Sequence, residues 1–321
     1  MKTLIVLLLS LISSSDAFVP LEQTFFQRAF KQKSHKLLAF RPELLENFQS
    51  DKSSLPSTVA ESLREEVGYS IGPWKKSVDP EQRLIFAKFW NWHLDFIHSK
   101  LTNIRPLRVT NKSRSRDFTL VDEADARLVN LCFESEEYRR IRMTHYDGGN
   151  KIQVLQALWY PNPQYNLPVL GIEMAQFGGG RAHMMASDFQ PIHDQEHDHA
   201  VLFRHLIDPI RDEYPLLQQE MSGRYYDHTH FTKSMLFSRF DDEKNIEETV
   251  VPAIQRYARE HVKMIQQLQP DKAGAAHVLA KQQAFDSYFA ERDQAIHMFR
   301  AKFGNDWAED FVYDVLFELS R

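Results

Sequence analysis

The sequence is poor in the residues that staple a chain or hold a metal cluster. Among 321 residues there is one cysteine, Cys132, which excludes an internal disulfide and an all-cysteine metal or iron–sulfur site. Glycine is scarce, with 11 residues. The Gly-rich motifs of the usual dinucleotide and nucleotide sites do not occur, so these functions have no support. The formal net charge of −5 argues against a general nucleic-acid binder.

Long apolar runs are confined to the N-terminus. Residues 4–12 are apolar and are followed by small residues up to Ala17, a pattern typical of a secretory signal peptide and too short for a membrane span. Residues 18–41 are basic and poor in acids, as transit peptides are. We therefore expect a signal peptide at 1–17 and a transit peptide at 18–41, which together address a complex plastid. Plain secretion is the alternative, and no membrane partner is expected.

The remaining chain has the composition of a folded protein. Hydrophobic residues make up 43% and aromatic residues 12%, with 23 Phe, which suits a dense core or a pocket for a large planar ligand. Residues 42–78 are polar and rich in serine, and this pattern indicates a linker. Residues 79–321 are predicted to form a single domain.

The periodicity of the apolar residues changes along the domain. Stretches of alternating apolar and polar residues, joined by short links such as 147–150, predict antiparallel hairpins. Segments whose apolar residues recur every three to four positions precede and follow these strands in the sequence. This order predicts an α/β fold with helices on both faces of a central antiparallel sheet. The expected strands are 138–145, 151–160, 168–177, 181–189 and 233–240, and the expected helices are 79–97, 194–220, 244–268, 273–302 and 305–319.

Two motifs carry weak chemical signals. Residues 68–72, which contain Ser70, match the nucleophile elbow of serine hydrolases, but Pro73 follows at once and a charged segment precedes them, which favours a loop. Residues 193–199 contain three histidines and three acids that could hold a metal. A solvated helix start with acids near its positive end accounts for the same composition, and we expect no metal site.

Two carboxyl groups are less easily explained. A period of two places Gln156 in an apolar row and Glu173 among Val169, Gly171 and Ala175. A buried Glu173 would have a raised pKa and could act as a general acid, whereas on a wet face it would simply be solvated. Asp293 lies among aromatic residues of an expected helix and could face inward, although such charge clusters are usually solvated.

Short motifs follow one another in a distinctive order between residues 138 and 317. They are Tyr138-Arg139-Arg140-Ile141-Arg142-Met143-Thr144, Asp147-Gly148-Gly149, Gln153-Val154-Leu155, Tyr160-Pro161, Phe177-Gly178, Asp188-Phe189-Gln190-Pro191, Ala290-Glu291-Arg292-Asp293, Phe303-Gly304 and Leu316-Phe317. Over roughly residues 115–320 this order and spacing resemble the ferredoxin-dependent bilin reductases, and among them most closely the branch that reduces biliverdin to 15,16-dihydrobiliverdin.

The resemblance implies a three-layer α/β/α sandwich that holds biliverdin IXα between the sheet and the C-terminal helices. It also implies a radical reaction without a bound metal or flavin, in which reduced ferredoxin supplies the electrons and side-chain acids supply the protons. The family's central acid, usually Asp, falls on Glu173, and its C-terminal acid falls on Asp293. Gln156 and Thr144 replace the His and Glu of the phycocyanobilin-forming branch, which argues against that product.

A bilin would need polar groups for its nitrogens and cations for its two propionates. Gln156 and Glu173 are candidates for the nitrogens, and Arg142, Arg181 and Arg239 are candidates for the propionates. Acidic ferredoxin would need a basic rim on the enzyme. Candidates for this rim are Arg139, Arg140, Lys233 and Lys302.

Other functions stay open at this stage. The chain could reduce dihydrobiliverdin, or biliverdin in two rounds, to phycoerythrobilin. It could also bind a bilin without reducing it, as a carrier or attachment lyase. A hydrolase built on Ser70 is the most distant alternative. If the product is dihydrobiliverdin, a second bilin reductase could receive it.

Overall fold

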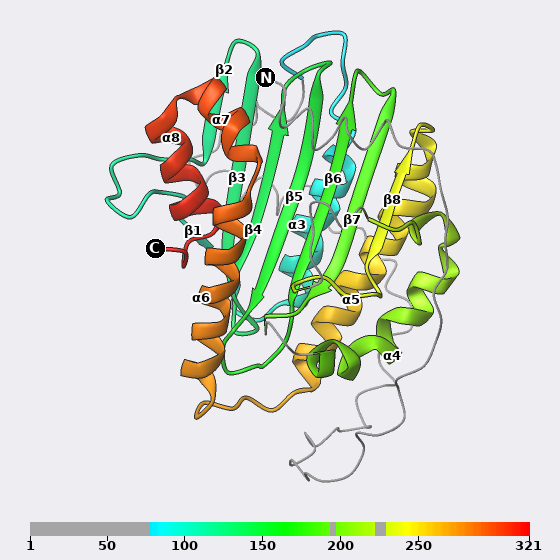
Figure 1. Cartoon of the computed structure of the whole chain (residues 1–321), viewed down its shortest axis with the longest axis vertical. Helices are drawn as coiled ribbons and strands as arrows, with labels where there is room; N and C mark the ends of the chain where they lie inside the picture. Colours follow the sequence, from blue (N-terminus) through cyan, green and yellow to red (C-terminus); the bar gives the residue numbers. More distant parts are fainter. Residues whose placement is uncertain (1–76, 193–196, 222–228) are drawn as a thin grey trace.

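The computed structural model describes residues 77–192, 197–221 and 229–321, without the side chains of 197–202. Its centre is an eight-stranded sheet in the order β1-β3-β4-β5-β6-β7-β8, with β2 paired to β3 and every pair antiparallel (Figure 1). The strands are β1 (Arg105–Leu107), β2 (Leu120–Glu123), β3 (Ala126–Glu134), β4 (Tyr138–Asp147), β5 (Ile152–Pro161), β6 (Val169–Phe177), β7 (Ala182–Gln190) and β8 (Leu236–Phe240).

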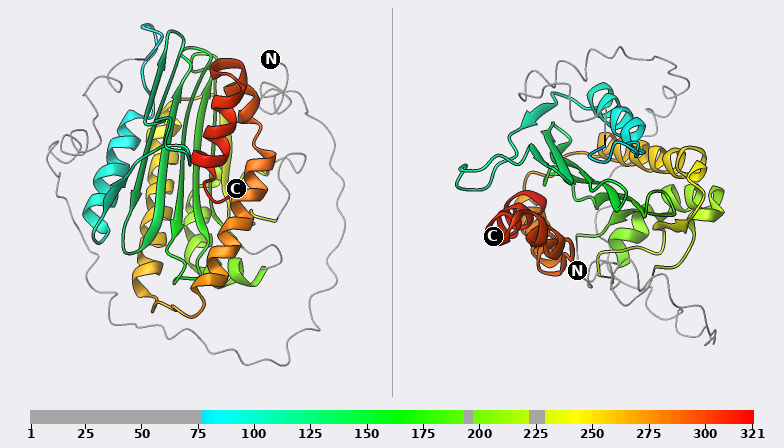
Figure 2. Two further views of the ribbon diagram at one scale, coloured as in Figure 1. Left: turned by 90° about the vertical axis from the view of Figure 1, so that its left-hand side faces the viewer. Right: turned by 90° about the horizontal axis from the view of Figure 1, so that it is seen from above.

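Helices cover both faces of this sheet. One face carries α3 (Ala87–Lys100) and α5 (Val251–Gln267), and the other carries α6 (Ala275–Arg292), α7 (Ala295–Phe303) and α8 (Asn305–Asp310) (Figure 2). The remaining helix, α4 (His197–Glu213), packs against α5. A 3₁₀ turn (Pro215–Leu217) and two π-helical segments (Ile246–Val250 and Phe311–Leu316) complete the regular structure of the described residues. The three-layer α/β/α sandwich is confirmed.

The period of two divides the side chains of each strand between two cores. On β5, Leu155, Ala157 and Trp159 are buried in the core beneath α3 and α5. Leu158 and Tyr160 point the other way, into the core beneath α6–α8. Each large apolar side chain that is fully buried contributes about 1.5–3 kcal/mol, so both faces fix the register of the strands.

The four strands predicted between residues 138 and 189 are confirmed, and each end lies within two residues of its predicted position. Short turns join most of them. Between β6 and β7 the chain reverses through Gly178, Gly179 and Gly180, whose φ angles are 58°, 68° and 93°. Side chains other than glycine rarely adopt this left-handed region. The sequence reasoning missed β3, which has apolar residues at most positions because both of its faces are buried.

Two helix predictions were wrong in detail. Residues 79–86 precede the helix rather than begin it, because the Asp79 carboxylate accepts a hydrogen bond from the Glu81 amide and closes a turn. The single helix expected at 273–302 is broken at Asp293, whose φ and ψ are −66° and 108°. There Oδ1 of Asp293 accepts a hydrogen bond of 2.7 Å from the Ala295 amide, which stabilises the break.

Several predictions fall on residues that the structure does not describe. These are the signal peptide (1–17), the transit peptide (18–41), the linker (42–78) apart from its last two residues, the Ser70 motif and the side chains of the histidine-rich segment 193–199. In the part that is described, no helix has both the length and the apolar character needed to cross a membrane. The same part contains no cluster of three His, Cys, Asp or Glu side chains suited to a metal ion.

Candidate active site

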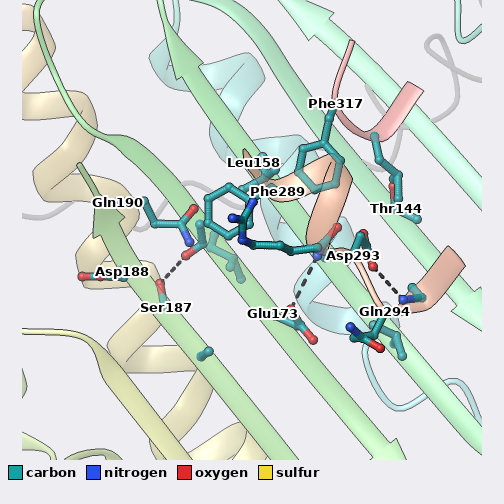
Figure 3. Close-up of a pocket in the computed structure, with 18 of the residues that line it drawn as sticks. Thr144, Leu158, Glu173, Ser187, Asp188, Gln190, Phe289, Asp293, Gln294 and Phe317 are labelled. Atoms are coloured by element: carbon teal, nitrogen blue, oxygen red, sulfur yellow. Dashed lines mark hydrogen bonds between the residues drawn. The ribbon is translucent and has the colours of Figure 1, made fainter. Parts of the chain in front are cut away.

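A cavity of about 370 Å³ lies between the sheet and the C-terminal helices. Its floor comes from strands β4 to β8, and its roof comes from α6, the link to α7, α7 itself and the segment Leu316–Phe317 (Figure 3). Apolar side chains, among them Phe289 and Phe317, make up much of the wall. This volume lies in the range of pockets that enclose small molecules.

Glu173 stands on the floor of this cavity. It occupies the centre of β6, directly opposite Gln156 on β5, and its Oε2 lies 3.5 Å from Nε2 of Gln156. Burial is the main cause that raises the pKa of Glu173 above its ordinary value, and the nearby Asp293 carboxyl adds to the rise. The Gln156 hydrogen bond and the Arg142 charge oppose it. Of the two possibilities left open by the sequence, the structure therefore shows the inward one.

Asp293 faces Glu173 from the roof. The break between α6 and α7 turns its carboxyl toward the cavity, where Figure 3 shows it near Glu173. Burial also raises the pKa of Asp293, against the Ala295 amide and the Arg142 charge. Because two neighbouring carboxylates repel each other, the pair favours a state in which at least one of them holds a proton. Two carboxyls with raised pKa values therefore lie where the floor and the roof of the cavity meet.

Arg142 lies beneath the cavity rather than at its mouth. Its side chain is 0% exposed. Nη1 donates to Oγ1 of Thr144 at 2.7 Å and Nη2 donates to Oε1 of Gln156 at 2.8 Å. These contacts leave no room for a propionate, so the proposed propionate role of Arg142 does not fit the structure. The arginine instead fixes the Gln156 amide with its Nε2 toward Glu173.

The other two predicted arginines do not line the cavity. Arg181 is exposed at the β6–β7 turn, where its Nε donates to the Gly178 carbonyl at 2.9 Å. Arg239 lies on β8 opposite Met184, which does line the cavity, and its guanidinium is 5.7 Å from the ring centre of Phe237. Arg239 is thus close to the cavity wall, whereas Arg181 lies apart from it.

Sequence reasoning missed several polar residues of the cavity wall, among them Arg292, Asp188 and Gln190. Arg292 is exposed at the cavity edge, with its guanidinium 4.1 Å from the ring centre of Tyr288. Asp188 and Gln190 come from β7 and are 2% and 7% exposed. All three belong to motifs that carried the resemblance, and the period of two on β7 would have placed Asp188 and Gln190 on the face of Glu173.

Asp188 is a third carboxyl in contact with the cavity. Its Oδ2 accepts from the Thr232 amide and its Oδ1 accepts from the Thr232 hydroxyl, both at 2.6 Å. Burial raises the pKa of Asp188 to about 6, although both hydrogen bonds lower it. The residue pairs with Gly171, two positions from Glu173 on the neighbouring strand. A single face of the sheet therefore carries two acids whose pKa values are raised.

The sandwich and its acid-lined, largely apolar cavity suit a protein that encloses a flat organic molecule and can protonate it. Comparison with known proteins identifies the class. The family model of the ferredoxin-dependent bilin reductases matches residues 93–318. The chain belongs to this family, and it is accordingly an oxidoreductase that acts on bilins.

The chain is similar to several individual enzymes of this family. The chain is 32% identical to the 15,16-dihydrobiliverdin:ferredoxin oxidoreductase of Nostoc punctiforme over 60% of its own length and 79% of the relative's. It is 34% identical to the enzyme of the same name from Gloeobacter violaceus, over 58% of this chain and 77% of that enzyme. It is 24% identical to the phycoerythrobilin:ferredoxin oxidoreductase of Nostoc punctiforme, over 74% of this chain and 94% of that enzyme.

Among solved structures, tomato phytochromobilin synthase in complex with biliverdin has the same fold. The TM-score is 0.63 at 18% identity, over 73% of this chain and 83% of that one.

Proposed function

We propose that this enzyme reduces biliverdin IXα at the C15–C16 double bond and releases 15,16-dihydrobiliverdin, with reduced ferredoxin as electron donor. The observation that carries the proposal is the pair Glu173 and Asp293, two carboxyls with raised pKa values that face each other across the cavity. The similarity to dihydrobiliverdin-forming relatives supports the same product.

The reaction adds two electrons and two protons across one carbon–carbon double bond. Ferredoxin delivers the electrons one at a time, so the bilin itself carries the unpaired electron after the first transfer. No bound metal or flavin is needed for this scheme. A bilin that has accepted an electron in an apolar cavity is strongly basic, and a neutral carboxylic acid nearby will protonate it.

Glu173 is the first proton donor in this scheme because it stands at the centre of the cavity floor. The amide of Gln156, held by Arg142, keeps its Nε2 toward the Glu173 carboxylate and stabilises it once the proton has left. Asp293 supplies the second proton or positions the pigment from the roof. Both carboxylates regain their protons from solvent when the product leaves.

The structure reduces the number of candidate cations for docking ferredoxin. Arg139 and Arg140 both pair with Glu318, and Lys302 pairs with Asp125. Lys233 is exposed in the segment that leads into β8, close to Phe231 and Met235 of the cavity wall. We therefore place the centre of the docking surface near Lys233, beside the cavity wall, where an incoming electron would have a short path to the pigment.

The third carboxyl favours one alternative product. Formation of phycoerythrobilin from biliverdin requires a second reduction at another part of the pigment, and hence two further protons. Asp188, farther along the same sheet face, is placed to supply one of them. Phycoerythrobilin is therefore the second candidate product.

One experiment tests these assignments. The purified chain is incubated without oxygen with biliverdin, ferredoxin and a system that reduces ferredoxin, and the products are identified by absorption and chromatography. Accumulation of a pigment with shortened conjugation that co-elutes with 15,16-dihydrobiliverdin is the expected result. Continued conversion to phycoerythrobilin would replace the proposed product by the alternative. Binding of biliverdin without any turnover would refute the proposal in favour of a carrier or lyase.

The fate of the product can be read in the same system. If the enzyme hands dihydrobiliverdin to a second bilin reductase, as we also propose, adding such an enzyme should convert the product without an accumulation of free pigment.

A further inference from the structure

One polar atom in the cavity wall has no partner among the described residues. Gln190, at the end of β7, lines the cavity with its side chain 7% exposed, and its Oε1 is buried without a hydrogen bond in this part of the chain. A buried acceptor without a partner costs about 1–3 kcal/mol. Such an atom beside a cavity points to a donor that arrives with a ligand.

The backbone of β6 makes room for this amide. Gly171 lies on the neighbouring strand, and a Cβ atom at this position would be 2.7 Å from Oε1 and 2.8 Å from Cδ of Gln190. Because real Cβ atoms do not approach other atoms so closely, any side chain at residue 171 would displace the amide. The glycine thus lets the Gln190 amide pack closely against β6 at the cavity wall.

The Gln190 amide lies to one side of Glu173 on the same face of the sheet. Glu173 pairs with Ala186 on β7, and Gln190 lies roughly 13 Å farther along that strand at a rise of about 3.3 Å per residue. A pigment that fills the cavity from Glu173 toward this amide brings one part of its edge against Oε1 of Gln190. A terminal ring of biliverdin is a cyclic lactam, with an N–H and a C=O side by side on one edge.

We infer that the Gln190 amide, seated on Gly171, binds the lactam edge of one terminal ring and thereby sets which way the pigment lies in the cavity. Oε1 accepts the lactam N–H, and Nε2 donates to the lactam carbonyl. An inner pyrrole ring could satisfy only the first of these two contacts. The inference rests on the proposed function, because it takes the pigment to be a bilin. Orientation in turn decides which double bond lies over Glu173 and Asp293.

Biliverdin itself is the probe for the test, titrated into the ligand-free chain and followed by its absorption and induced circular dichroism. We expect Gln190→Leu to weaken binding about tenfold, since it removes contacts worth about 1.4 kcal/mol, and to spread the reduction over more than one double bond in the turnover assay. Gln176→Leu is the matched control, because Gln176 is equally buried on β6 but does not line the cavity. This variant should bind and orient the pigment as the wild type does.

A double-mutant cycle separates a ligand contact from a general loss of structure. Gly171→Ala should weaken binding about as much as Gln190→Leu, because it displaces the same amide. In a Gln190→Ala background, Gly171→Ala should weaken binding no further. If Gln190→Leu does not fold, the same contact is tested by comparing the effect of Gly171→Ala on binding in the wild type with its effect in the Gln190→Ala background.

Failure of the proposed function and failure of the lactam contact give different results. A wild-type chain that neither binds nor reduces biliverdin would overturn the proposed function. A wild type that binds and reduces it, while Gln190→Leu and Gly171→Ala keep its affinity and its single product, would overturn the lactam contact alone.

Discussion

Replacing Glu173 by Gln should separate electron transfer from protonation. The amide has nearly the shape of the neutral carboxylic acid, and its oxygen can still accept from Nε2 of Gln156, which now lies 3.5 Å from Glu173. The cavity should therefore keep its shape and its affinity for the pigment. What the variant lacks is a proton that it can give up, so a bilin that has accepted an electron should remain unprotonated at this position.

The magnitude follows from the role of a general acid, which is worth about 10²–10⁴-fold in rate. Turnover of Glu173→Gln should fall by this factor, while the Kd for biliverdin changes by less than about threefold, because a neutral hydrogen-bonding group replaces another. Glu173→Asp restores the acid usual in the family with a shorter side chain. It should recover part of the rate and show whether reach, and not just acidity, matters.

Stability should change with pH in a defined direction. Burial raises the pKa of Glu173 above its ordinary 4.5, so the folded state holds this proton more tightly than the unfolded state. The wild type must then lose stability relative to Glu173→Gln as pH rises from about 4.5 through the raised value. Turnover of the wild type should decline over the same interval, because the donor loses its proton.

The assay combines stopped-flow absorption with electron paramagnetic resonance under anaerobic reduction. A long-lived organic radical in Glu173→Gln, with little product, is the expected signature. Asp286→Asn is a suitable control, because Asp286 is a buried carboxyl with a raised pKa that does not line the cavity. Undiminished turnover of Glu173→Gln, with the same product, would refute the assignment of the proton donor.

Further predictions concern the surroundings of this acid and the N-terminal segment. Arg142→Met should lower the free energy of unfolding in urea by about 1–3 kcal/mol, because Gln156 Oε1 loses its buried donor, and a stability equal to that of the wild type would contradict this role. Asp293→Asn should slow product formation about 10²-fold yet leave the radical signal of the first electron transfer in place; a variant that never forms the radical would show that Asp293 acts before protonation. Residues 1–41 fused to a fluorescent protein should direct it to the plastid of an alga with a complex plastid, and export from the cell would favour plain secretion instead.

The strands could be predicted because their patterns are local, whereas Glu173 and Asp293 were singled out by the family resemblance and not by local pattern alone. On β5 and β6 the alternation of side chains determines which residues share a face, so Gln156 and Glu173 could be placed together before their pairing was known. Whether that face was wet or enclosed depended on helices more than 100 residues farther along the chain, and no local pattern reports such packing.

The buried position of Arg142 could not be predicted for a related reason. A sequence indicates that a guanidinium is available but not whether a neighbouring strand already binds it. Arg142 binds Thr144 on its own strand and Gln156 on the next, and this contact exists only because β4 and β5 pair in that register. The same applies to Gln190, whose amide acquires its place from Gly171 across the β6–β7 ladder.

The break at Asp293 links the fold to the chemistry more closely than any other local feature. An uninterrupted helix would have projected this side chain from a helical position, with its carboxyl free to turn to solvent. The break instead engages Oδ1 with the Ala295 amide, and the residue lines the cavity that also contains Glu173. That hydrogen bond favours the carboxylate, whereas burial favours the acid and is the larger cause, so the pKa of Asp293 is raised. This combination of a cavity position and a raised pKa is the basis on which we propose Asp293 as the second proton donor or as a positioning residue.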